Sequence, residues 1–113
     1  MSLLLSLALA VSHPHQELNL MQVGDCQWVR GRFRFYNGSG IRRIWVIGTN
    51  HQLNLSDRDD DVPDRRFSMD NKWPREDYFA RYYVCAVEPY REGEMQRVSL
   101  KGYRGLVVKK HEF

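Results

Sequence analysis

The sequence predicts an all-β fold: either a small five- or six-stranded antiparallel barrel of the OB-like kind or a two-sheet sandwich, with at most one short helix. Short β-rich runs separated by turns that contain glycine or proline recur from residue 26 to residue 109. The first two runs meet at Asn-Gly-Ser-Gly, residues 37–40, a pattern typical of a hairpin with a short loop or bulge. Gly31 in the middle of the first run favours the barrel, because glycine often marks the point where a sheet coils.

The first run, residues 26–36, alternates between an apolar face and a basic face, as a half-buried strand does. The apolar face holds Val29, Gly31, Phe33 and Phe35, and the basic face holds Arg30, Arg32 and Arg34. The second run, residues 41–47, carries apolar residues on both faces. We therefore expect it to be a central strand that is covered on both sides.

The remaining elements are predicted in chain order. Residues 48–55 predict a weak third strand, and the charged residues 56–72, which include Pro63, predict a mobile acidic surface loop. Residues 73–80 predict the start of a short helix, because Pro74 suits a first helical position and Glu76 and Asp77 suit a first turn. Strands are then expected at residues 82–87, 95–101 and 106–109, with residues 102–105 joining the last two.

The N-terminal residues predict export. Residues 1–10 form an apolar block ending in Ala-Leu-Ala, the small-x-small form of a signal-peptide cleavage site, and the block is too short to anchor in a bilayer. We expect a periplasmic or secreted protein with a tether at residues 11–22, a short edge strand at residues 18–23, a single β domain at residues 23–113 and no transmembrane segment in the mature chain. The alternative is a cytosolic domain with residues 3–11 packed in its core.

Two cysteines, Cys26 and Cys85, fit an oxidising destination, because each lies beside or inside a β-rich run. A disulfide across their 59-residue separation contributes about 4 kcal/mol in the chain-entropy model. The alternative is two unrelated buried thiols. A Cys-x-x-Cys metal or redox motif is absent from the sequence.

The charge distribution predicts a basic body with one acidic loop. The formal net charge of the chain is +3. Residues 57–64 are rich in aspartate, so the rest of the chain is more basic than this net charge indicates. A basic body attracts nucleic acid, anionic lipid or acidic glycans. The candidate binding face is the basic side of the first strand, on which arginines alternate with aromatic residues: Trp28, Arg30, Arg32, Arg34 and Tyr36. The simpler interpretation is a solvated strand whose arginines pair with acids on a neighbouring strand.

The motifs of common enzyme classes and cofactor sites are absent, so we expect neither catalysis nor a cofactor. Asp57, Asp59 and Asp61 alternate like calcium ligands, but Val62 and Ser68 occupy the positions where an EF-hand needs glycine and a bidentate acid. Loose divalent binding is the weaker alternative there. Cleavage after Ala10 would expose Val11, Ser12 and His13, whose nitrogens are able to form a square-planar Cu(II) or Ni(II) site.

Several short stretches resemble one group of exported proteins. They are Cys26, Val29-Arg-Gly-Arg32, Tyr36-Asn-Gly38, Arg43-Ile-Trp45, Gly48-Thr49, Val84-Cys85 and Glu94-Met-Gln-Arg-Val98. Together they resemble a group of small exported proteins of Gram-negative bacteria over roughly residues 26–100. The two cysteines recur in that group, which implies a disulfide here. The resemblance implies no activity, and the acidic residues 57–64 depart from it.

These observations lead us to expect a small exported binding or accessory protein. Its expected partner is an anionic glycan, a lipid or a protein of the cell envelope, and nucleic acid is less favoured because of export. One alternative is a structural or assembly protein of the envelope. Another is an OB-like domain that binds single-stranded nucleic acid, which applies if the N-terminal block is not a signal peptide.

Overall fold

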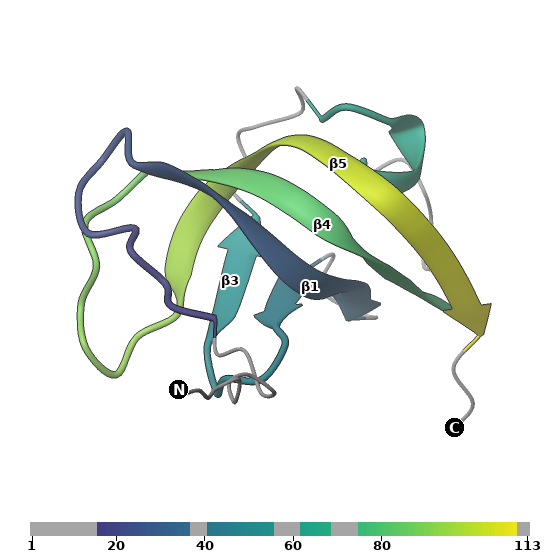
Figure 1. The fold of residues 1–113 in the computed structure, drawn as a ribbon, viewed down its shortest axis with the longest axis horizontal. Helices are drawn as coiled ribbons and strands as arrows, with labels where there is room; N and C mark the ends of the chain where they lie inside the picture. The colour runs from purple at the N-terminus through teal and green to yellow at the C-terminus, as the bar shows by residue number, and fades with distance from the viewer. Residues whose placement is uncertain (1–15, 37–40, 56–61, 69–74, 111–113) are drawn as a thin grey trace, which may run out of the picture.

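The computed structural model describes residues 16–36, 41–55, 62–68 and 75–110. These residues form an all-β fold, as predicted, with one 3-10 turn. The strands are β1 (Cys26–Tyr36), β2 (Ile41–Val46), β3 (Gln52–Leu55), β4 (Glu76–Ala86) and β5 (Gln96–Lys110), and the turn is η1 (Arg65–Phe67). Figure 1 shows β1, β4 and β5 as long curved ribbons, with β3 beneath them.

The strands pair in the order β1-β2-β3-β5-β4, and β4 pairs with β1 to close the ring. Four of the pairs are antiparallel, whereas β3 and β5 run parallel from the Leu53–Gln96 pair to the Leu55–Val98 pair. The prediction of wholly antiparallel pairing is therefore wrong for this pair. The reason is geometric: strand directions cannot alternate all the way around a ring with an odd number of strands, so at least one neighbouring pair has to be parallel.

The core lies inside the ring and is built from the alternate residues of each strand. β1 contributes Val29, Phe33 and Phe35, and β4 contributes the residues from Tyr78 to Ala86 that face inward. Gly31 also faces inward, and a β-carbon built there would lie 2.5 Å from Cγ2 of Ile44. The glycine thus lets β2 approach β1 closely, which agrees with the role predicted for it.

Two of the predicted elements differ in the structure. Residues 76–80 are the start of β4 and not a helix, because Tyr78 and Ala80 continue the inward alternation of Tyr82. Tyr78 pairs with both β1 and β5, and Ala80 pairs with β1. The favourable local signals for a helix are overridden by pairing on two sides. Residues 95–101 and 106–109 belong to one strand, β5, because residues 102–105 continue the ladder with β4 through two register shifts.

The segments outside the strands also contribute to the core. Leu20 is buried, and Nε2 of Gln96 donates to its carbonyl oxygen at 2.7 Å, so the described part of the predicted tether packs on the domain. No edge strand forms at residues 18–23. Phe67 of η1 is fully buried against Phe33, Tyr78, Tyr82 and Tyr103. The prediction of a mobile loop is therefore wrong for residues 62–68.

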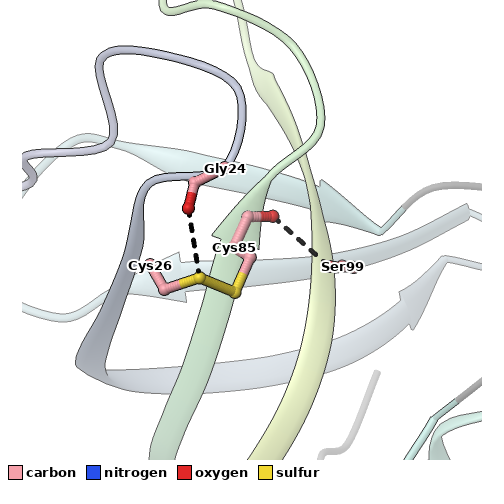
Figure 2. Close-up of a disulfide and its surroundings, with 4 residues drawn as sticks. All are labelled: Gly24, Cys26, Cys85 and Ser99. Carbon is pink, nitrogen blue, oxygen red and sulfur yellow. Dashed lines mark hydrogen bonds between the residues drawn. A yellow bond between two sulfur atoms is a disulfide. The ribbon is translucent and has the colours of Figure 1, made fainter.

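The predicted disulfide is present between Cys26 and Cys85, which are directly paired in the β1–β4 ladder with their Cα atoms 4.0 Å apart. Figure 2 shows the bond beside Ser99 of β5, whose Oγ donates to the carbonyl of Cys85 at 3.5 Å. Cys26 and Cys85 are both only partly covered. The cross-link thus lies on the outer surface and ties the first residue of β1 to the end of β4.

Candidate anion-binding face

The outward side chains of β1, β2, β4 and residues 102–110 of β5 form a surface that we call the basic–aromatic face. Strand pairing places these side chains in rows that cross the strands. One row holds the aromatic residues Trp28 and Tyr83, whose ring centroids are 5.2 Å apart. The next row holds Arg30, Arg81 and Arg104, and the row after it holds Trp45, Arg32, Phe79 and Val107. Basic and aromatic groups therefore lie side by side along the strands and across them.

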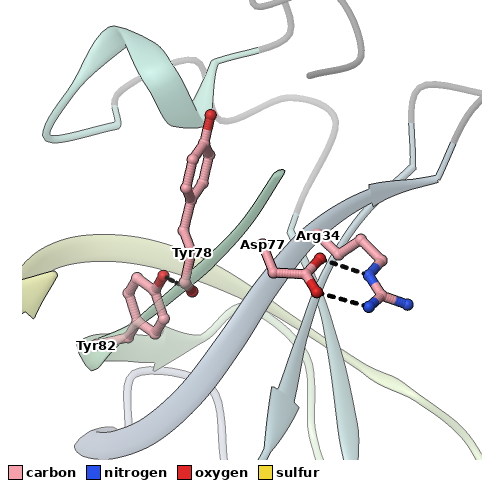
Figure 3. Close-up of polar contacts among 4 residues, drawn as sticks. All are labelled: Arg34, Asp77, Tyr78 and Tyr82. Atoms are coloured by element: carbon pink, nitrogen blue, oxygen red, sulfur yellow. Dashed lines mark hydrogen bonds and ion pairs between the residues drawn. The ribbon is translucent and has the colours of Figure 1, made fainter. Parts of the chain in front are cut away.

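Arg34 is neutralised by a carboxylate. Its Nε and Nη2 donate to the two carboxylate oxygens of Asp77, each at 2.7 Å, as Figure 3 shows. Asp77 is 6% exposed, so this is a bidentate pair that is largely removed from water. The hydrogen bonds to Asp77 raise the pKa of Arg34. Arg34 therefore follows the simpler interpretation, in which an arginine of the first strand pairs with an acid on a neighbouring strand.

Four other bases of the face lie over aromatic rings. The guanidinium of Arg32 lies 5.1 Å from the ring centroid of Trp45, and that of Arg43 lies 4.6 Å from Tyr36. Arg104 lies 4.1 Å from the ring of Trp28, and Nζ of Lys109 lies 5.6 Å from that of Phe79. A ring orients a cation without cancelling its charge. These groups therefore keep their positive charge for a ligand.

Arg30 and Arg81 are exposed, and no ion pair joins either of them to an acid of the described residues. They are directly opposite in the β1–β4 ladder, and Arg81 is directly opposite Arg104 in the β4–β5 ladder. Like charges in such positions repel each other. These three arginines line an open groove of about 390 Å³ together with Ile47, Phe79 and Val107.

The sequence placed only part of this face. All five predicted residues, Trp28, Arg30, Arg32, Arg34 and Tyr36, lie on the outer side of β1. Phe79 was missed because residues 73–80 were predicted to begin a helix, and Arg81 was missed because it lies between that segment and the strand predicted at residues 82–87. Arg104 was missed because residues 102–105 were predicted only to join two strands. Alternation extended back from residue 82 would have placed Phe79 and Arg81 on an outer face, whereas the register shifts on either side of Arg104 break the alternation of β5 there.

Two polar clusters lie outside this face. At η1, Asp64 accepts hydrogen bonds from the backbone N–H of Arg66 at 3.0 Å and from the hydroxyl of Tyr103 at 2.7 Å, and both lower the pKa of Asp64. Tyr82 donates to the carbonyl of Tyr78 at 2.5 Å, and burial raises the pKa of its hydroxyl (Figure 3). The first cluster joins η1 to β5, and the second lies within β4.

Arg42 is a buried base that the sequence did not predict. It lies on the inner side of β2 at 1% exposure, and its Nη1 donates to the carbonyl of Phe67 at 3.0 Å. The local pattern gave no signal for it, because inward positions of β2 were expected to be apolar. This hydrogen bond joins β2 to η1 and so helps to hold Phe67 of η1 on the core.

The predicted metal sites, Val11-Ser12-His13 and Asp57, Asp59 and Asp61, lie outside the described residues. Within the described ranges, no group of three or more histidine, cysteine or acidic residues is arranged to hold a metal ion.

No helix in the described part of the chain is long and apolar enough to span a bilayer. Comparisons with protein-family models, curated proteins and solved structures find no match to this chain.

Proposed function

We propose that this protein is a small exported, non-catalytic binding protein that holds an anionic ligand on its basic–aromatic face. The observation that carries the proposal is the way in which the bases of this face are held. Arg32, Arg43, Arg104 and Lys109 lie over aromatic rings, and only Arg34 is engaged by a described carboxylate. The face therefore presents oriented charges that an anion is able to neutralise.

The strand order supports an OB-like assignment, which we propose together with the function. OB folds bind oligosaccharides and oligonucleotides on their outer sheet surface and neighbouring loops. Export, indicated by residues 1–10 and supported by the disulfide, favours an anionic glycan or lipid of the envelope over nucleic acid. The rings of Trp28, Trp45 and Tyr36 already carry a stacked arginine, so nucleobases would have to displace these cations in order to stack.

The proposal is tested by retention on heparin resin with a salt gradient. A face variant carries Arg30→Gln, Arg43→Gln and Arg81→Gln. A matched control carries Arg65→Gln, Arg91→Gln and Arg97→Gln, which remove the same charge from exposed positions elsewhere in the described chain. We expect the face variant to elute at clearly lower salt and the control to elute near the wild type. Equal elution of the two variants would refute a dedicated face and leave only the effect of net charge.

A further inference from the structure

The arginine row Arg30, Arg81 and Arg104 combines a high concentration of charge with an apolar surface. The residues come from three adjacent strands, and each is directly opposite the next. Directly paired residues have Cα atoms about 4.5–5.5 Å apart, so the three side chains leave the sheet close together, and all three line one groove. Because such a row is unfavourable for the empty fold, its presence points to a bound counter-charge.

The floor beside this row is apolar. Ile47, Phe79 and Val107 line the same groove as the arginines, and its volume of about 390 Å³ falls within the range of small-molecule pockets. Val107 is 52% exposed, so its side chain is open to a ligand. A purely polar anion would leave this floor in water. The groove therefore matches a ligand that carries an apolar chain next to its charge.

We infer that this groove binds the phosphate head and the first carbons of the hydrocarbon chain of a lipid-like alkyl phosphate. Phosphate suits three guanidiniums better than carboxylate does, because it offers three oxygens and up to two negative charges, and arginine binds it in a bidentate manner. Arg81 lies between the other two arginines and is the central contact. Phe79 and Val107 form the surface for the chain. This inference rests on the proposed function and specifies its ligand class.

Titration calorimetry with a series of soluble phosphates tests the inference on the full chain. The probes are inorganic phosphate, hexyl phosphate and octyl phosphate, all as monomers, with octyl glucoside as a neutral amphiphile. Each methylene that is buried on an apolar floor raises affinity by about fourfold. We expect affinity to rise from inorganic to hexyl to octyl phosphate and to be weak for octyl glucoside. Equal affinities across the phosphates, or equal binding of octyl glucoside, would overturn the inference.

Variants assign the two halves of the groove. Arg81→Gln should weaken every phosphate by about tenfold or more, because a charged hydrogen-bond partner is lost. Arg81→Lys should recover part of this loss, and Arg91→Gln should bind as the wild type does. Val107→Ser should lower the gain from chain length but leave inorganic phosphate unchanged. Melting temperature and elution volume confirm that each variant is folded. Binding that Arg81→Gln leaves unchanged places the site elsewhere and contradicts the inference.

Further probes separate this inference from the proposed function. If heparin retention depends on the face while alkyl phosphates show no chain-length effect, the anion-binding function stands and the lipid inference fails. If neither probe depends on the face, both fail. A single-stranded oligothymidylate that binds more tightly than octyl phosphate and competes with it at Arg81 would replace the lipid with nucleic acid. Vesicles of anionic phospholipid that bind while octyl phosphate does not would replace the single-lipid groove with a flat membrane contact.

Discussion

The arginines of β1 differ in the groups that hold them, and the sequence alone could not show this difference. Alternation along residues 26–36 predicts correctly that Arg30, Arg32 and Arg34 share a face. Their partners come from other strands: Asp77 lies 43 residues from Arg34 along the chain. Local pattern reports which way a side chain points, whereas the register of a distant strand decides whether its charge is free.

Replacement of Asp77 by alanine should be costly, because it leaves the guanidinium of Arg34 partly buried without its carboxylate. We expect a loss of about 2 kcal/mol in the free energy of unfolding, measured by urea denaturation. The matched control is Arg97→Ala, which breaks the exposed pair with Glu88, in which Arg97 is 56% exposed. That change should cost less than about 1 kcal/mol. Similar losses in both variants would show that the Arg34–Asp77 pair behaves as an ordinary surface ion pair.

Among the elements, β1, β2 and β3 were largely predictable, whereas β4 was predicted only over its second half and β5 only as two separate strands. The first three carry clear alternation or apolar runs between glycine-containing turns, so their local signals agree with the final fold. β4 begins with Glu76 and Asp77, whose charges suit a first helical turn, and β5 passes through Gly102 and Gly105. In both strands the ladder hydrogen bonds to neighbours outweigh weak local preferences. The set of residues predicted for the candidate face was therefore incomplete.

Gly31 tests how tightly β1 and β2 pack. In Gly31→Ala the new β-carbon would lie 2.5 Å from Cγ2 of Ile44 and 3.3 Å from the carbonyl oxygen of Trp45. Since Trp45 contributes backbone, only part of this overlap is able to relax, and we expect a loss of about 1–3 kcal/mol by urea denaturation. Gly102→Ala is the control, because no atom lies within 4 Å of its β-carbon. A neutral Gly31→Ala would mean that the strands separate easily.

The whole molecule is a closed ring whose closure could not be derived from local pattern. A barrel and a sandwich use the same short strands, and only the long-range pairs β3–β5 and β1–β4 distinguish them. The basic–aromatic face depends on this closure, since its arginine row takes one residue from each of β1, β4 and β5. The cysteines were a stronger long-range signal, because a chain that is predicted to be exported and has two cysteines has few alternatives to one cross-link.

Removal of the cross-link should destabilise the molecule as a whole. In Cys26→Ser/Cys85→Ser we expect a loss of about 4 kcal/mol in the free energy of unfolding, because the unfolded chain regains the freedom of a 59-residue loop. Urea denaturation measures the loss, and Ser99→Ala, which removes the neighbouring hydroxyl, serves as the control. The wild type in reductant should match the double variant. A wild type that is equally stable with and without reductant would contradict a structural role for the bond.

The position of the disulfide also decides how the molecule responds to tension. A force applied at residues 16 and 110 passes from Cys26 directly to Cys85 through the covalent bond, and the loop between them carries no load. With 59 residues of separation, roughly 200 Å of contour length is withheld from extension. Pulling therefore separates β5 from the sheet, while β1, β2 and β3 bear no force. In single-molecule stretching, reduction of the disulfide should release the withheld contour length as a second step.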